Sequence, residues 1–335
     1  MHWMHASVRL GGILCGLAVV VAPVEGYGRI GHWLTGQIAQ KLLTSEAEAW
    51  VRFLLPDYDG SLARASLWAD EIHLPWASKY HYVNPPTGDS CTANFPAPSP
   101  SSPCTCILSA IQNYTRITHV GPTLEDRSEA IKFLIHYIGD VHQPLHVSSR
   151  GRGGTTETVR FNGRSGMSFH EVWDYGLLEL REKRLNHSRT SYADYLLSTY
   201  PSMPATCDPF LESQYFACPA LWATESAALV CKLVYPALPH HERSDFVHLD
   251  AAERAADKNG EILREDDLAG AYFDAVIVQA EERVVHAGRR MAQVLNAIAA
   301  SASVPGAAVE EAGVGEFVSR ITQGRVSPGR LIKQQ

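Results

Sequence analysis

The sequence has no run of apolar residues long enough to cross a membrane. Its longest such run, residues 10–21, spans twelve residues, whereas a membrane-spanning helix needs about 20. Arg9 precedes the run, and the short stretch 24–26 follows it, which is typical of a secretory signal peptide. We therefore expect a secreted or lumenal protein that has no stable association with a membrane.

The cleavage site is predicted from the residues after this run. A cut just before Pro23 would be unfavourable, so we predict that residues 1–26 are removed and that the mature chain begins at Tyr27. Two glycosylation sequons, at Asn113 and Asn186, agree with a secretory route.

Basic residues are also scarce. The chain has 29 Lys and Arg against 36 Asp and Glu, which gives a net charge of −7. Because no basic stretch runs through it, a strong electrostatic hold on duplex DNA is not expected. Metal cations bound inside a site would reverse the sign of the charge locally.

The cysteines lack the C-x2-C spacing of zinc fingers. Cys15 leaves with the signal peptide, and the six that remain in an oxidising compartment predict disulfides, with fifteen possible pairings. Proximity suggests that Cys207 pairs with Cys218. Cys104 and Cys106 are too close in sequence to pair comfortably, so their pairing stays open.

Helical periodicity dominates the rest of the chain. Apolar residues recur at helical spacing in residues 30–42, 47–54, 130–141 and 273–298, and Ser45 is the expected cap of the second segment. These segments predict an all-α protein.

Strand-like alternation is best developed in Thr156–Phe161, which suggests one small β-hairpin. We therefore expect a single, mostly helical domain over residues 27–300. Within it, residues 84–106 are rich in Pro and Ser and should form a cross-linked surface loop. Residues 301–335 show little periodicity; a flexible tail, removed as a propeptide, and a docking segment both fit.

Histidine and aspartate recur in an order that can build a metal centre. A single His-x3-Asp pair is weak evidence, because the chain has fifteen His and such pairs arise by chance. The whole ordered set is harder to produce by chance, and imidazole and carboxylate are ligands that zinc prefers when thiolates are tied up elsewhere. The set comprises His32, Asp70, His81, His136, Asp140, His146, His170 and Asp174.

The spacing predicts how some of these residues group. Residues four apart share a face of a helix, so His136 and Asp140 should point into one site. Pro144 should kink or end that helix and turn His146 toward a second site nearby. His142 should face away from that site, where it would have a structural role or would orient a metal ligand from outside.

Two further members support the grouping. His170 and Asp174 repeat the four-residue spacing. Asp70 has apolar neighbours in sequence, where a lone carboxylate would be costly unless it is paired or bound to a metal.

These motifs resemble those of the zinc-dependent, single-strand-specific nucleases of fungi and plants, which share a fold with bacterial zinc phospholipase C. The resemblance runs from residue 27 to about residue 298. It is carried by Gly31-His32, Trp68-Ala69-Asp70-Glu71, His81-Tyr82-Val83, the run from Gly139 to His146, His170-Glu171-Val172-Trp173-Asp174 and Trp222-Ala223-Thr224-Glu225-Ser226.

The resemblance implies a mostly helical fold that binds three zinc ions. The ligands of the first ion would be Asp70, His81, His136 and Asp140. The ligands of a second ion, close to the first, would be His32, Asp140, and the free amine and carbonyl of Tyr27. Those of the third would be His146, His170 and Asp174. Because the amine at Tyr27 exists only after cleavage, removal of the signal peptide would create a metal ligand.

The resemblance also implies an activity. In such enzymes the ions activate a water that attacks phosphorus in line and stabilise the charge that develops. The implied substrates are RNA and single-stranded DNA, cut to 5′-nucleotides, and 3′-nucleotides, which lose their phosphate. Asp70 and Asp140 would be catalytic, together with His73, which stands where many members carry an Arg that steadies the phosphate. We expect a monomer.

Several positions depart from the family pattern or bear on the substrate. His73 can donate one hydrogen bond but not the two of a guanidinium fork. Tyr82 would stack on a base, which suits single strands because a paired base cannot offer its face freely; core packing is the alternative. Asn84 replaces a usual Asp, so base preference would broaden or shift. Tyr27 stands where the family usually has Trp, and Thr155 stands where the family commonly has Asn.

Similarity to the family also suggests that Cys91 pairs with Cys231.

Two other interpretations of the protein's function stay open. One is a zinc phospholipase C, although that branch typically supplies Glu where this chain has Asp174. The other is a secreted, non-catalytic protein stabilised by zinc, to which His73 gives some weight.

Overall fold

The structure is a computed structural model that describes residues 27–86, 94–98, 104–202, 207, 217–238 and 267–301. The predicted signal peptide, the tail beyond residue 301 and Cys91 lie outside these residues. None of the helices in the described part is long and apolar enough to cross a membrane.

The fold is almost entirely helical, as the sequence predicts. The α-helices are α1 (Arg29–Lys41), α2 (Ser45–Leu54), α3 (Leu62–Ala65), α4 (Trp68–Glu71), α5 (Ile107–Val120), α6 (Leu124–Asp140), α7 (Gly151–Gly154), α8 (Phe169–Glu171), α9 (Leu177–Leu185), α10 (Arg189–Thr199), α11 (Cys218–Leu229) and α13 (Ala271–Ser301). Shorter helical turns are η1 (Pro56–Tyr58), η2 (Ser78–Tyr80), η4 (Pro144–Val147), η5 (Val172–Gly176) and η6 (Val230–Val234).

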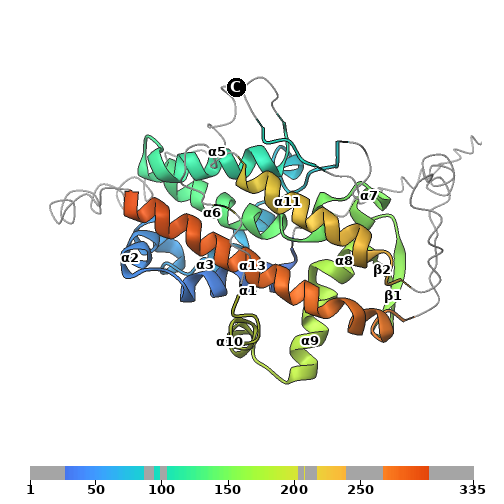
Figure 1. The fold of residues 1–335 in the computed structure, drawn as a ribbon. Helices are drawn as coiled ribbons and strands as arrows, with labels where there is room; N and C mark the ends of the chain where they lie inside the picture. Colours follow the sequence, from blue (N-terminus) through green and yellow to red (C-terminus); the bar gives the residue numbers. More distant parts are fainter. Residues whose placement is uncertain are drawn as a thin grey trace, which may run out of the picture.

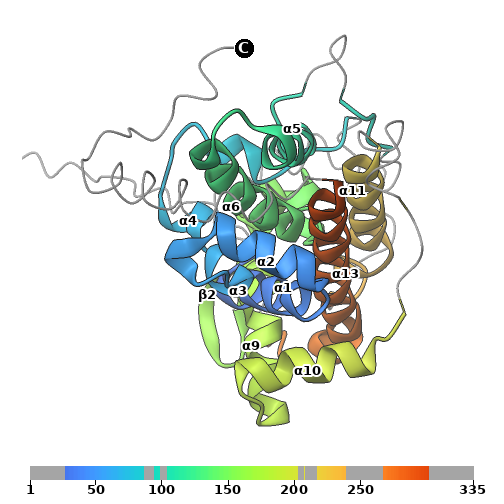
Figure 2. The same ribbon diagram turned by 90° about the vertical axis from the view of Figure 1, so that its left-hand side faces the viewer.

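The long helix α13 organises the core. It packs against α1, α2, α6 and α9, and α11 runs alongside it across the molecule (Figures 1 and 2). A side chain at Gly288 would collide with Ile38, which shows how closely α13 approaches α1. The face of α13 that the sequence predicts to be buried is buried, from Val276 to Leu295.

Two helix boundaries differ from the prediction. Helix α6 begins at Leu124, because the side chain of Thr123 accepts a hydrogen bond from the backbone of Asp126 and caps the first turn. Helix α2 is capped by Thr44, whose side chain accepts from the backbone of Ala47, and not by Ser45. In both places a threonine one residue before the helix satisfies the free backbone N–H groups.

The predicted β-hairpin is present and leads into the functional site. Strands β1 (Thr158–Phe161) and β2 (Arg164–Ser168) pair antiparallel across an Asn162-Gly163 turn, a pair suited to the left-handed backbone that both residues adopt. The side chain of Asp267 accepts from both turn N–H groups. Ser168, the last residue of β2, caps α8, which carries His170.

The disulfides correct one expectation. Cys207 pairs with Cys218, as proximity suggested. Cys104 pairs with Cys106, a pairing that the sequence analysis left open because only one residue separates them. Their Cα atoms lie 5.4 Å apart, within the usual disulfide range. Cys231 is disulfide-bonded, and its pairing with Cys91 stays a prediction.

Candidate metal centre

Eight side chains from distant parts of the chain converge on one buried region. They form three groups whose ligand atoms lie within 4.8 Å of one another. The groups are His32 with Asp70 and His136, His81 with His136 and Asp140, and His146 with His170 and Asp174. These are the eight side chains that the sequence selects as ligands.

Asp140 lies at the centre of the first two groups, which we call the paired site. It is the last residue of α6, and it is fully buried. Its Oδ1 lies 3.1 Å from His32 Nε2, and its Oδ2 lies 3.0 Å from His81 Nδ1 and 3.2 Å from His136 Nε2. Asp70 Oδ1 lies 3.3 Å from His136 Nε2. One carboxylate therefore faces both halves of the site.

Tyr27 brings the start of the described chain to the same carboxylate. Its backbone nitrogen lies 2.9 Å from Asp140 Oδ1. The Tyr27 ring is buried and meets the His32 ring edge-on. Only a glycine fits at position 31, because a Cβ there would overlap the Tyr27 ring. The Gly31-His32 motif thus leaves room for the aromatic ring that anchors the residue-27 nitrogen.

The third group, which we call the third site, is built from two segments. His146 lies on η4, which follows the end of α6 as Pro144 predicts. His170 Nε2 lies 3.1 Å from Asp174 Oδ2, and His146 Nε2 lies 3.5 Å from Asp174 Oδ1. Asp174 sits in a π-helical turn, a feature often found at functional sites.

Backbone carbonyls orient three of the imidazoles. His136 Nδ1 lies 2.7 Å from the carbonyl of Ser66, His146 Nδ1 lies 2.7 Å from that of His81, and His170 Nδ1 lies 2.6 Å from that of Gly153. Each ring donates its Nδ1–H to that carbonyl, which directs Nε2 into the site. A fixed outer partner of this kind is usual for metal-bound histidine.

Burial and neighbouring charges pull the pKa values of the cluster apart. Burial alone lowers the pKa of His136, but Asp140 and Asp70 raise it well above its ordinary value. Burial alone raises the pKa of Asp140, but His136 and His32 hold it well below its ordinary value. Around His146, burial lowers the pKa, but the carboxylates raise it to about 9. The carboxylates thus favour the protonated forms of His136 and His146, and a divalent cation would compete with those protons for the ring nitrogens.

The donor set fits zinc. Zinc bonds of about 2.0–2.2 Å in tetrahedral geometry place ligand atoms roughly 3.3–3.6 Å apart. The nitrogen–oxygen separations in the paired site are 3.0–3.8 Å. Among the described residues, the buried Nε2 atoms of His32, His146 and His170 each lie 3.1–3.5 Å from a carboxylate oxygen, but none makes a hydrogen bond of good geometry. Burying such nitrogens is costly unless they bind something, and a cation would satisfy them.

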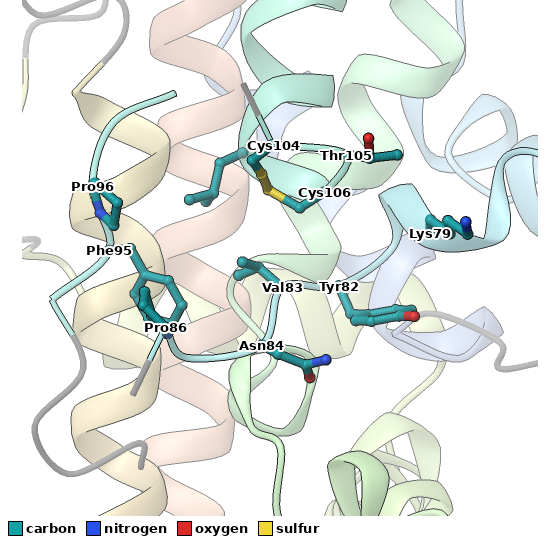
Figure 3. A pocket seen from close by; sticks show the side chains of 11 residues that line it. Lys79, Tyr82, Val83, Asn84, Pro86, Phe95, Pro96, Cys104, Thr105 and Cys106 are labelled. Carbon is teal, nitrogen blue, oxygen red and sulfur yellow. A yellow bond between two sulfur atoms is a disulfide. The ribbon is translucent and has the colours of Figure 1, made fainter. Parts of the chain in front are cut away.

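The two residues predicted to contact substrate line a cavity beside the metal centre. Tyr82 and Asn84 follow His81, and the intervening Val83 donates its N–H to the carbonyl of His146. The cavity holds about 360 Å³, and Figure 3 shows Tyr82 and Lys79 on one side of it and Phe95 on the other. Tyr82 is 36% exposed, so its ring is not packed into the core.

Other predicted residues lie outside the three ligand groups. His73 adopts a left-handed backbone, and its Nδ1 lies 2.8 Å from the carbonyl of Glu71. His142 lies away from the three groups, with its Nε2 2.9 Å from an Arg290 nitrogen. Asn113 lies on α5, and Asn186 is the exposed residue that ends α9. Glycosylation at both sequons stays a prediction.

Sequence reasoning gave no role to several residues that hold the ligands in place. Ser66 and Gly153 act through backbone carbonyls, which leave no side-chain signal in a sequence. Gln143 does act through its side chain, because its amide donates a 2.7 Å hydrogen bond to Asp174. Its place inside the run from Gly139 to His146 was the available signal.

Comparison with known proteins agrees with this geometry. The model of the S1/P1 nuclease family matches residues 27–300. The chain belongs to the S1/P1 nuclease family. Nuclease P1 of Penicillium citrinum is 30% identical over 289 residues, which cover 81% of this chain and 97% of that protein. Endonuclease 1 of Arabidopsis thaliana is 30% identical over 319 residues, which cover 85% of this chain and 90% of that protein. Nuclease S1 of Aspergillus oryzae is 29% identical over 294 residues, covering 83% and 93%.

Membership confirms the resemblance noted in the sequence and the helical fold expected from it. It also makes the chain a nuclease, and hence a hydrolase that acts on ester bonds of nucleic acids. The His and Asp groups that could bind metal ions lie inside the matched region.

Proposed function

We propose that the mature protein is a secreted, three-zinc phosphodiesterase that cuts RNA and single-stranded DNA to 5′-nucleotides and also removes the phosphate from 3′-nucleotides. The observation that carries this proposal is the convergence of eight His and Asp side chains, seven of them buried, into three ligand groups, two of which share the carboxylate of Asp140. Membership of the S1/P1 nuclease family supports hydrolysis of nucleic acids over the phospholipase C alternative, whose substrate is a lipid.

The ligand sets are those that the sequence suggests. Asp70, His81, His136 and Asp140 would hold one ion, and His32, Asp140 and Tyr27 its neighbour. The third ion would be held by His146, His170 and Asp174. When bound, the ions would ionise a water for attack on phosphorus and stabilise the charge that develops. The protein's own contribution is to fix the donors and to exclude bulk water by burying them.

The nitrogen of Tyr27 makes signal cleavage part of the proposal. Before cleavage it is an amide nitrogen, whose lone pair is delocalised into the carbonyl and does not bind zinc. After cleavage it is an amine with a free lone pair, at the position that lies 2.9 Å from Asp140 Oδ1. The disulfides of the described residues suit the oxidising compartment that such processing implies.

Tyr82 and Asn84 would receive a nucleobase. An exposed aromatic ring beside an amide, at the rim of a cavity next to His81, suits stacking on one face of a base and hydrogen bonding to its edge. Because a base in a duplex is already stacked and paired, this arrangement favours single strands. We assign Tyr82 to the base, in preference to core packing, on its exposure.

His73 would contribute less to the phosphate than an arginine would. Its Nδ1 lies 2.8 Å from the carbonyl of Glu71, so the neutral ring has only Nε2 left for a substrate oxygen. As an acceptor in this neutral form, Nε2 would bind phosphate poorly. Phosphate contact therefore requires the protonated ring.

The test is a count of metal ions on purified protein whose first residue is Tyr27. We expect about three zinc ions per chain and hydrolysis of a single-stranded oligonucleotide that is lost with a chelator and restored by zinc. A duplex of the same sequence should be cut far more slowly. Correctly processed protein that binds no zinc would refute the proposal, and release of phosphocholine from lipid without nucleotide release would favour the phospholipase.

A further inference from the structure

The turn between two ligands of different sites is held from outside the metal centre. Asp140 belongs to the paired site and His146 to the third site, and only residues 141–145 separate them. The carbonyl of Val141 accepts a 2.8 Å hydrogen bond from Ser226 Oγ on α11. The carbonyl of His142 accepts a 3.2 Å hydrogen bond from Arg283 Nε on α13. Both helices lie far away in sequence.

One guanidinium connects these contacts. Besides the carbonyl of His142, Arg283 donates to Ser226 Oγ at 2.8 Å and to Glu225 Oε2 at 3.2 Å. It is 4% exposed, and burial is the largest cause of a pKa lowered to about 10.

The His142 ring closes the same network. Its Nδ1–H donates to the carbonyl of Ile138 at 2.7 Å, so Nε2 is the acceptor for Arg290 at 2.9 Å. Arg290 in turn makes two hydrogen bonds to Glu225, at 2.7 and 2.9 Å. The motif from Trp222 to Ser226 thus serves the segment that carries Asp140 and His146, although none of its residues lies in a ligand group.

We propose that Arg283 is a positioning residue for the metal centre: together with Ser226 it fixes the Val141–His142 turn and so sets the placement of Asp140 relative to His146. This inference rests on the proposed zinc sites. Metal affinity depends on ligands that stay in place when the ions leave, because each mobile ligand must be ordered again on binding.

Shape as well as charge is required at position 283. The Arg283 guanidinium reaches a carbonyl, a hydroxyl and a carboxylate in different directions. A lysine could keep the ion pair with Glu225, but its compact ammonium on a flexible stem does not reproduce the planar fork. Arg283→Lys therefore keeps the charge and loses the clamp on the carbonyl of His142.

The simpler reading is that Arg283 is a buried ion-pair partner that only stabilises the fold. Helix α13 offers a matched control, because Arg181 pairs with its buried Glu281 at 3.0 Å. That pair holds α9 and α10 against α13, and its other hydrogen-bond partners are Tyr192, Tyr195 and Tyr200, none of which is a ligand residue. Replacing Arg181 by lysine perturbs a comparable ion pair without touching the turn.

The experiment measures zinc affinity and stoichiometry on folded protein, by competition with a chelator and elemental analysis. We expect Arg283→Lys to weaken at least one site about 10- to 100-fold, the usual effect of losing a partner of a metal ligand. Ser226→Ala, a small change that keeps the ion pairs, should weaken the same site in the same direction. Arg181→Lys should bind zinc as the wild type does, even where its Tm falls.

Two results would overturn the inference. Zinc affinity unchanged in both Arg283→Lys and Ser226→Ala would show that the turn needs no clamp. An equal loss in Arg181→Lys and Arg283→Lys would show that affinity only follows stability. Failure of the zinc proposal itself would look different, because the wild-type protein would then bind no zinc.

Discussion

Adding one methyl group at Gly31 should disable the paired site. A Cβ at this position would lie 2.8 Å from Tyr27 Cγ and 3.0 Å from Cε1, with Cδ1 closer still. The Tyr27 ring is 1% exposed and sits edge-on to His32, so it has no room to turn away. In Gly31→Ala, Tyr27, the first residue of the proposed mature chain, must therefore move as a unit.

The size of the movement follows from contact distances. Relaxed carbon–carbon contacts are about 3.5–4.0 Å, so the Tyr27 ring must shift by roughly 1 Å. Metal–ligand distances tolerate only about 0.2 Å. A nitrogen displaced by that much leaves the coordination shell, so we expect loss of one zinc ion and a fall in kcat of at least about 100-fold. Overpacking should also cost about 1–3 kcal/mol of stability.

The assay is the zinc count and kcat of mature Gly31→Ala, with Gly121→Ala as the control. A Cβ at Gly121 would lie 2.5 Å from the carbonyl of Ile117, an equally tight contact in the turn before α6. The opposite end of α6 carries Asp140, so the control should lose stability but keep three zinc ions. Adding Tyr27→Ala to Gly31→Ala removes the clash and should restore part of the zinc. Full zinc content and normal turnover in Gly31→Ala would refute the reasoning.

Three further predictions use other parts of the structure. Asp140→Asn should abolish hydrolysis and release both ions of the paired site, because its carboxylate faces imidazoles on each side; near-normal turnover would contradict its bridging role. Tyr82→Ala should raise KM for single-stranded oligonucleotides roughly 5- to 100-fold while Tyr82→Phe should not, since base stacking contributes about 1–3 kcal/mol; equal KM values in both variants would exclude the ring as a base platform. Burial, together with the charges of Arg283 and Arg290, lowers the pKa of His286 from 6.5 to about 4. The unfolded chain therefore takes up this proton first, and stability should fall as pH drops from 6.5 toward 4. In protein from which a chelator has removed the metal, the Tm of His286→Gln should fall less than that of the wild type between pH 6.5 and pH 4. Parallel plots of Tm against pH for the two proteins would refute the assignment.

The local features of the site could be predicted because they are local in sequence. His136 and Asp140, and His170 and Asp174, are pairs four residues apart, and a helical turn brings each pair together whatever surrounds it. Pro144 ends the helix after Asp140 for an equally local reason, the missing N–H of proline. Periodicity also located the buried face of α13, since one side of a long helix must be apolar to pack.

Predictions failed, or stayed open, where the local sequence permits more than one outcome. Thr44 and Ser45 are both good helix caps, and the structure uses the threonine. Cys104 and Cys106 are separated by one residue, yet a bend brings their Cα atoms to 5.4 Å, a distance that a disulfide spans. In each case the outcome depends on backbone angles that a residue pattern does not specify.

Contacts between distant segments explain why the residues that support the His and Asp groups could not be predicted, whereas the eight side chains of those groups could. All eight are His or Asp, so their residue types point to them. The carbonyls of Ser66 and Gly153 can belong to any residue, and Arg283 reaches the turn before His146 only because α13 crosses the whole molecule (Figure 1). If zinc affinity depends on that arginine, then a chain with every ligand present can still be a weak zinc binder. Ligand motifs alone would then overstate how many members of such a family are active.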